Sequence, residues 1–241
     1  MVIAGKTDKG KIREINEDTY CINKISDFLA YAIVCDGMGG SAGGEIASEK
    51  AVKIISEKFN NGLVEGIKNN TIHYMLESSI LTANKVVFDC AKNNSILKGM
   101  GTTVVMAVIN NNTLHIAHAG DSRAYLFRQG ELHRLTVDHT VVQSLVDHGE
   151  LTEDQAKNHP DKNIITRALG VSEDILFDQS EVYLQSKDIL LLCTDGLSNY
   201  VDANQIKDIL LEGVETAPSK LINLANKAGG KDNITAVTML I

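Results

Sequence analysis

Hydrophobic residues along the chain gather in short continuous runs that Gly, Asn or Asp residues separate. The runs are rich in Val, Ile, Leu and Thr, a composition that is typical of buried β-strands. They predict strands at Leu29–Cys35, Thr102–Ile109, Thr113–Ala119, Arg123–Phe127, Ile189–Cys193 and Ile234–Ile241. Because Asn110–Asn112 and Gly120–Ser122 join three consecutive runs, we expect these strands to form a meander, with a fourth piece after Gln129-Gly130.

Two longer segments repeat their hydrophobic residues every three or four positions, which predicts helices with one buried face. The first stripe consists of Ile46, Val52, Ile55 and Phe59, and the second of Ile72, Met75, Leu76, Ser79, Ile80, Ala83, Val86 and Val87. Shorter helices are expected after Thr152 and Asp202, each of which forms a capping-box pattern with a Gln three residues later. Pro218 suits the first turn of another helix.

The order of these elements favours the α+β class with antiparallel sheets, because helices stand between runs of strands instead of alternating with them. The chain has 241 residues, 44% of them hydrophobic, which is enough for one sizeable core. Since only 2 prolines occur and no Ser/Gly/Pro-rich segment interrupts the pattern, we expect a single domain over residues 1–241.

The net charge restricts the classes of partner that we expect, and the cysteine content restricts the cellular compartment. The formal net charge is −8, which disfavours nucleic acid and anionic membrane surfaces as partners. None of the 4 cysteines is spaced as in a metal finger, so we expect buried free thiols in a reducing compartment. The first ten residues lack the apolar core of a secretory signal, and no hydrophobic run is long enough to span a bilayer. We therefore expect a cytoplasmic protein.

Acidic residues stand where several predicted strands begin or end. Asp36 and Asp195 directly follow hydrophobic runs, Asp121 ends another, Asp232 opens the last strand, and Glu17-Asp18 precedes an apolar segment. Each Asp-Gly pair alone indicates a turn. Together they could converge in space, and clustered carboxylates repel one another unless protons or cations neutralise them.

The type of ligand indicates which metal would bind. No Cys or His motif accompanies the acidic residues, so a zinc-type site is not supported. Carboxylates suit hard divalent cations such as Mg²⁺ and Mn²⁺, and a pair of these can activate water for attack at phosphorus. Arg13, five positions before Asp18, offers a planar fork that matches phosphate oxygens.

Six short motifs resemble those of the PPM (PP2C-type) protein serine/threonine phosphatases, and they occur in the family's order over nearly the whole chain. They are Arg13–Asp18, Val34–Gly40, Gly99–Thr103, Ala119–Arg123, Leu192–Leu197 and Gly230–Thr235. The resemblance implies a central sandwich of two antiparallel sheets flanked by helices, with metals in a cleft at one end. It also implies hydrolysis of phosphoserine and phosphothreonine in proteins, by direct attack of a water that bridges two Mn²⁺ or Mg²⁺ ions.

The resemblance further implies roles for individual residues. Asp36 would bridge two metals, the Gly37 carbonyl would bind one, and Asp195 and Asp232 would hold the other. Asp121, with Asp195, matches the site of a third, weaker metal in bacterial members. Glu17 and Asp18 would orient metal-bound waters, and Arg13 would bind the substrate phosphate.

The sequence departs from some family members at one position. Met38 follows the Asp36-Gly37 pair where the animal enzymes carry a histidine, as it does in the bacterial branch. We expect His115 and His118 to be packing or surface residues. The segment at about 138–170 resembles the variable flap beside the cleft in bacterial members, where it would shape substrate access.

Two alternatives remain open: a non-catalytic signalling module with this fold, or another two-metal phosphohydrolase such as a nuclease or nucleotide phosphatase. Against the first stands the complete set of Arg13, Asp36, Asp195 and Asp232. Against a nuclease stands the lack of a basic stripe with interleaved aromatic residues. We expect a monomer whose substrates are phosphorylated by a bacterial Ser/Thr kinase.

Overall fold

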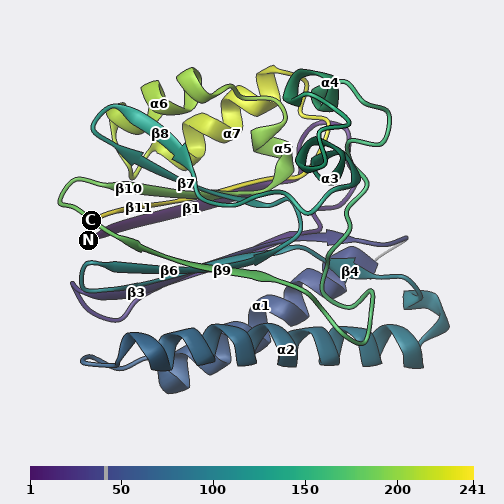
Figure 1. Ribbon diagram of the computed structural model, residues 1–241, viewed down its shortest axis with the longest axis horizontal. Coiled ribbons are helices and arrows are strands. Elements are labelled where there is room, and N and C mark those ends of the chain that lie inside the picture. Colours follow the sequence, from purple (N-terminus) through teal and green to yellow (C-terminus); the bar gives the residue numbers. More distant parts are fainter. Residues whose placement is uncertain (41–42) are drawn as a thin grey trace.

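The strands form two antiparallel sheets stacked face to face (Figure 1), in a computed structural model that describes residues 1–40 and 43–241. The five strands of the first sheet, in spatial order, are β1 (Val2–Asp8), β11 (Ile234–Leu240), β10 (Ile189–Cys193), β7 (Arg123–Arg128) and β8 (Glu131–Arg134). The main path of the second sheet is β2 (Asp18–Lys24), β3 (Leu29–Met38), β5 (Val104–Asn110), β6 (Thr113–Ala119) and β9 (Asp178–Tyr183). The short strand β4 (Gly101–Thr102) pairs with the end of β3.

Helices cover the two outer faces of this sandwich. Figure 1 shows α1 (Gly43–Gly62) and α2 (Asn69–Asn93) against the second sheet, and α6 (Ala203–Glu212) and α7 (Ala217–Lys227) against the first. The short helices α3, α4 and α5 lie at the end of the sandwich away from the two termini. These and the 3₁₀ turn η1 span Val141–Asp147, Glu153–Lys157, Asp195–Ser198 and Ser95–Leu97.

The hydrophobic core has three layers, and alternation along β3 shows how the sequence builds them. Leu29, Tyr31 and Ile33 face the long helices, whereas the residues between them face the other sheet. Successive side chains of a strand point to opposite faces, so a continuous apolar run suits a sheet that is covered on both sides. The third layer lies between the first sheet and α5 to α7.

All the strands and helices predicted from the hydrophobic pattern are present, and both capping boxes form. One prediction is wrong in detail: the run from Thr102 is broken, because Thr102 belongs to β4 and forms an isolated bridge with Leu169, while β5 starts at Val104. Four strands of the described residues, β1, β2, β4 and β9, were not among those predicted. Within the described residues, no helix combines the length and the apolar character that a membrane crossing requires.

Candidate active site

The pairing of β2 with β3 brings two aspartates together at the end of the second sheet. Asp18 is the register partner of Asp36, and by strand alternation both lie on the face that points toward the first sheet, at the start of β2 and near the end of β3. The Asp36 main chain is fixed by the next segment along: its N–H donates to Thr103 Oγ1 at 3.0 Å, and its carbonyl accepts from Thr102 Oγ1 at 2.9 Å. Asp36 therefore projects from a fixed backbone into the space between the sheets.

Asp18 is buried and is held by the facing sheet. Its Oδ2 accepts hydrogen bonds from the hydroxyls of Thr194 at 2.8 Å and Thr235 at 2.7 Å. Its Oδ1 is buried and has no hydrogen-bond partner among the described residues. A buried carboxylate oxygen without a donor is costly in a native protein, so it points to a missing cation, proton or water.

Two further aspartates lie on neighbouring strands of the first sheet. Asp195 begins α5 directly after β10, and Asp232 stands just before β11, which pairs with β10. The main chains of the residues that follow them approach closely: a Cβ added at Gly196 would lie 1.9 Å from the carbonyl oxygen of Asn233. Only glycine fits there. The motif residue after Asp195 thus allows the two carboxylates to share one edge of the sheet.

Gly37 has the same function after Asp36. A Cβ at Gly37 would lie 2.1 Å from the Gly44 carbonyl oxygen at the start of α1, and 2.7 Å from the Glu17 carbonyl oxygen. The Gly37 N–H donates to that Glu17 oxygen at 3.1 Å, and the Glu17 N–H donates to Asn233 Oδ1 at 2.8 Å. The missing side chain therefore lets the segment that carries Glu17 pack against both Asp motifs.

Asp121 occupies the corner between β6 and β7, and only 8% of its surface is exposed. Its Oδ1 also lacks a hydrogen-bond partner among the described residues. Beside it, the Arg123 guanidinium pairs with Asp138 through Nε at 3.0 Å and Nη2 at 2.7 Å. This ion pair joins the corner to the segment 138–170.

Arg13 closes its planar fork on Asp232. The Nε to Oδ1 and Nη2 to Oδ2 distances are both 2.9 Å, and half of the Arg13 side chain is exposed. Arg13 thus stands at the rim of the carboxylate cluster with its guanidinium directed at one of the predicted ligands. The geometry is the two-point contact by which arginine binds carboxylates and phosphates.

Ionisation of the clustered carboxyl groups is strongly unfavourable. Burial raises the pKa of Asp18 and that of Asp121 to about 7, and the pKa of Asp195 to about 6. Burial and the neighbouring aspartates, Asp18 first among them, raise the pKa of Asp36 well above its ordinary value. Each of the four groups feels the charge of another, so they share one electrostatic environment. Without a positive ion, this site takes up protons.

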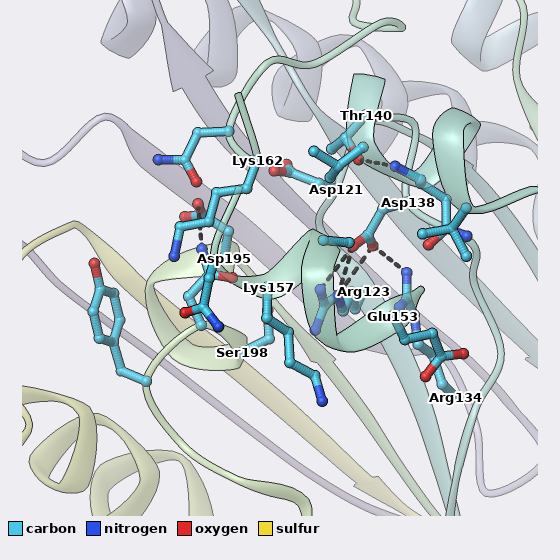
Figure 2. Close-up of a pocket in the computed structure, with 18 of the residues that line it drawn as sticks. Asp121, Arg123, Arg134, Asp138, Thr140, Glu153, Lys157, Lys162, Asp195 and Ser198 are labelled. Atoms are coloured by element: carbon cyan, nitrogen blue, oxygen red, sulfur yellow. Dashed lines mark hydrogen bonds and ion pairs between the residues drawn. The ribbon is translucent and has the colours of Figure 1, made fainter. Parts of the chain in front are cut away.

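A cleft of about 830 Å³ opens beside the cluster. Figure 2 shows Asp121 and Asp195 in its wall, together with the Arg123–Asp138–Arg134 ion pairs and Lys157 and Lys162 from the segment 138–170. The wall is made by that segment on one side and by α5 and the start of α6 on the other. None of the described residues that line it is a histidine.

The residues present suit hard divalent cations. The candidate ligands are all oxygens, two buried carboxylate oxygens lack partners, and carboxylate clusters with carbonyls and water are what Mg²⁺ and Mn²⁺ prefer. The structure brings all eight residues predicted for the site to one end of the sandwich, which is the end where Figure 1 shows α3 to α5. They are Arg13, Glu17, Asp18, Asp36, Gly37, Asp121, Asp195 and Asp232.

Sequence reasoning missed the threonines that hold the aspartates. Thr102, Thr103, Thr194 and Thr235 all donate to, or accept from, the carboxylates or main chain of Asp18 and Asp36. The signal was present, because each lies inside a motif at a strand end that contains Gly or Asp. The pairing of Arg123 with Asp138 left no such signal.

Comparisons with known proteins show the family of this chain. Residues 12–145 match the family model described as "Protein phosphatase 2C". A serine/threonine phosphatase of Listeria welshimeri is 39% identical over 234 residues, which cover 96% of this chain and 92% of the relative. A protein phosphatase of Streptococcus pneumoniae is 37% identical over 240 residues, or 98% and 95% of the two chains.

Solved structures extend the likeness to three dimensions. The serine/threonine phosphatase Stp1 of Staphylococcus aureus has a TM-score of 0.93 at 34% identity, and the match covers 99% of this chain and 94% of that one. A second structure, the catalytic domain of the phosphatase PstP in complex with two manganese ions, has a TM-score of 0.86 at 32% identity, covering 98% and 96%. Sequence and fold together place this chain in the protein phosphatase 2C (PPM) family, as a serine/threonine phosphatase of its bacterial branch.

Proposed function

We propose that this protein hydrolyses phosphoserine and phosphothreonine in proteins with the help of divalent cations bound at the carboxylate cluster. The observation that carries the proposal is the convergence of Asp18, Asp36, Asp121, Asp195 and Asp232 beside an open cleft, with two buried carboxylate oxygens unpaired among the described residues. A cluster of this kind is stable at neutral pH only when cations compensate its charge.

The ligand sets are those that the family resemblance implies. Asp36 would bridge two cations, with the Gly37 carbonyl on one of them and Asp195 and Asp232 on the other, while Asp121 and Asp195 would hold a weaker third ion. Glu17 and Asp18 would orient the water molecules that the cations bind. Two Mn²⁺ or Mg²⁺ ions would supply water that is nucleophilic at neutral pH and attacks phosphorus directly, and would offset charge on the phosphoryl oxygens.

The protein's own side chains bind and orient the substrate. Arg13 would hold the phosphate oxygens with the same fork that contacts Asp232 in this structure, once cations neutralise that carboxylate. Because no histidine lines the described cleft, the leaving alkoxide would take its proton from water and not from a histidine side chain.

Five broader proposals accompany this function. The substrates would be proteins phosphorylated by a bacterial Ser/Thr kinase, and the protein would act in the cytoplasm as a monomer. Residues 1–241 would form one catalytic domain. The segment at about 138–170 would serve as a flap, because it forms one wall of the cleft next to the cation-binding residues.

The first test is hydrolysis of a phosphothreonine peptide with Mn²⁺, with Mg²⁺ and with EDTA, for the wild type and Asp195→Ala. Loss of a cation ligand should lower kcat/KM at least about a hundredfold. Asp174→Ala is the matched control, since Asp174 is exposed and outside the cleft. Full activity in EDTA, or an unimpaired Asp195→Ala, would rule out the proposed chemistry.

A further inference from the structure

His139 lies at the start of the segment 138–170 and is almost completely buried, with 6% of its surface exposed. Its ring stacks on that of His118, with centroids 4.6 Å apart and planes within 9° of parallel. The proposed phosphatase chemistry uses neither histidine. Both lie beside the corner that carries Asp121: His118 is near the end of β6, and His139 contacts Gly120.

A metal ion is the first candidate, because ligand atoms of His118, His139 and Asp178 lie within 4.8 Å of one another. The surrounding contacts oppose it. His118 Nε2 already contacts the Val137 carbonyl at 2.8 Å, and the Arg167 guanidinium lies 3.1 Å from His139 Nε2. A bound cation would have to displace that guanidinium, so the cluster is better described as a hydrogen-bond network.

The contacts of His139 connect it to the Asp121 corner from two sides. Its N–H donates to the Gly120 carbonyl at 3.0 Å, and the Gly120 N–H donates back to the ring Nδ1 at 3.2 Å. On the other side, the His139 carbonyl accepts from the Thr166 N–H at 2.8 Å. One residue thus links the two ends of the segment 138–170 to the residue that precedes Asp121.

The network also fixes the tautomer of the ring. Because Nδ1 accepts the Gly120 N–H, the neutral ring carries its proton on Nε2, 3.3 Å from the Asp178 Oδ2. The 3.1 Å approach of Arg167 Nη1 to Nε2 is then a close contact between two donors and not a hydrogen bond. The Arg167 Nη1 donates to the other oxygen of Asp178 at 2.8 Å. Burial, His118 and Arg167 lower the pKa of His139 to about 4, so the ring is neutral at pH 7. In a protonated ring, the second proton would sit on Nδ1 and point at the Gly120 N–H, so that hydrogen bond would be lost.

We propose that His139, as its Nε2–H tautomer, is a positioning residue that holds the Gly120–Asp121 corner in place against the segment 138–170. Its backbone contacts would remain in any variant, so the part that belongs to the side chain is the bond from Gly120 N–H to Nδ1. Loss of this hydrogen bond makes the Gly120–Asp121 corner more mobile and lowers the affinity for the cation that Asp121 would bind. Only this last consequence rests on the proposed function.

Two isosteres separate the possible contacts of the ring. Asn places an amide oxygen near the Nδ1 position and can accept from Gly120, whereas Gln reaches toward the Nε2 position and Asp178. We therefore compare His139→Asn, His139→Gln and His139→Ala, with His148→Ala as the control. His148 is an exposed histidine of the same segment.

The first measurement uses metal-free protein. The ¹⁵N spectrum of the wild-type imidazole should show the Nε2–H tautomer. Exchange of the Gly120 amide proton should be about fivefold faster or more in His139→Ala and His139→Gln, and close to wild type in His139→Asn and His148→Ala. An Nδ1–H tautomer in the wild type, or equal protection in the Gln and Asn variants, would overturn the proposal.

The second measurement is calorimetric titration with Mn²⁺, using Asp121→Ala to identify the weak ion. In His139→Ala this affinity should fall about fivefold, with His139→Asn near wild type. If Asp121→Ala binds Mn²⁺ as the wild type does, the proposal that Asp121 holds a third cation is wrong. The positioning of Gly120 by His139 is then judged by the metal-free data alone. If Asp121→Ala abolishes weak binding while His139→Ala leaves it unchanged, His139 does not position Asp121.

Discussion

At the scale of single residues, two arginines with similar contacts should have opposite effects. Arg13 makes a two-point contact with the partly exposed carboxylate of Asp232, and an ion pair this close to the surface adds little stability. Arg128 instead binds Asp188, which is 2% exposed and also accepts from the Gln185 N–H at 2.8 Å. The first pair therefore belongs to the candidate site, and the second belongs to the scaffold.

Lysine at each position tests this division, because it keeps the charge and loses the fork. Arg13→Lys should lower kcat/KM for a phosphothreonine peptide at least about tenfold and leave Tm unchanged. Arg128→Lys should leave kcat/KM unchanged and lower the free energy of unfolding by about 1–3 kcal/mol, measured in urea. If Arg13→Lys lowered stability and spared activity, Arg13 would be a structural residue.

At the scale of elements, the helix α2 anchors the end of the segment 138–170. Asn84 is buried in α2, and its side-chain amide donates to the carbonyls of Ser172 at 3.0 Å and Glu173 at 2.9 Å. Its oxygen accepts from the buried Gly170 N–H at 2.8 Å. These three hydrogen bonds all go to one loop, which leads from the segment 138–170 into β9. The side chain therefore fixes where that segment ends.

Asn84→Ala should lower the free energy of unfolding by about 1–3 kcal/mol, because it leaves the Gly170 N–H buried without an acceptor. Ser79→Ala is the matched control: Ser79 is also buried in α2, and its hydroxyl has no partner among the described residues. This control should change stability by less than about 0.5 kcal/mol. Urea denaturation measures both, and equal losses would show that burial alone, not the hydrogen bonds, decides the cost.

The same scale shows what the sequence could predict. Central strands such as Leu29–Met38 are apolar on both faces, and the two capping boxes are local, so both were predicted. The edge strands β1 and β9 lack a long apolar run and are partly exposed, and they become strands only by pairing with β11 and β6. Strand-end motifs indicated the aspartates of the site. Contacts between distant segments, such as Asn84 with Gly170, left no pattern along the chain.

At the scale of the whole molecule, the carboxylate cluster joins the two sheets. Asp18 and Asp36 come from one sheet, and Thr194, Asp195 and Thr235 come from the other or directly follow its strands. Charge repulsion in the cluster therefore acts to separate the layers of the sandwich at one end. The stability of the entire fold should depend on the protons or cations bound there.

Metal-free protein should accordingly become less stable as pH rises from about 4.5 to 7. The pKa values of Asp18 and Asp121 are raised to about 7 and that of Asp195 to about 6, so the native state binds more protons than the unfolded state in this interval. Stability is then lost as each group ionises through its folded pKa. One pKa unit corresponds to about 1.4 kcal/mol, or about 3–6 °C in Tm for a chain of this size. Calorimetry in EDTA measures the slope of Tm against pH. Asp18→Asn should reduce this slope, because asparagine keeps the shape of the side chain and does not titrate.

Millimolar Mn²⁺ should raise Tm most at pH 7, where the cluster is most charged. A metal-free Tm that increases with pH over this interval would mean that the cluster is already compensated by groups of the protein itself.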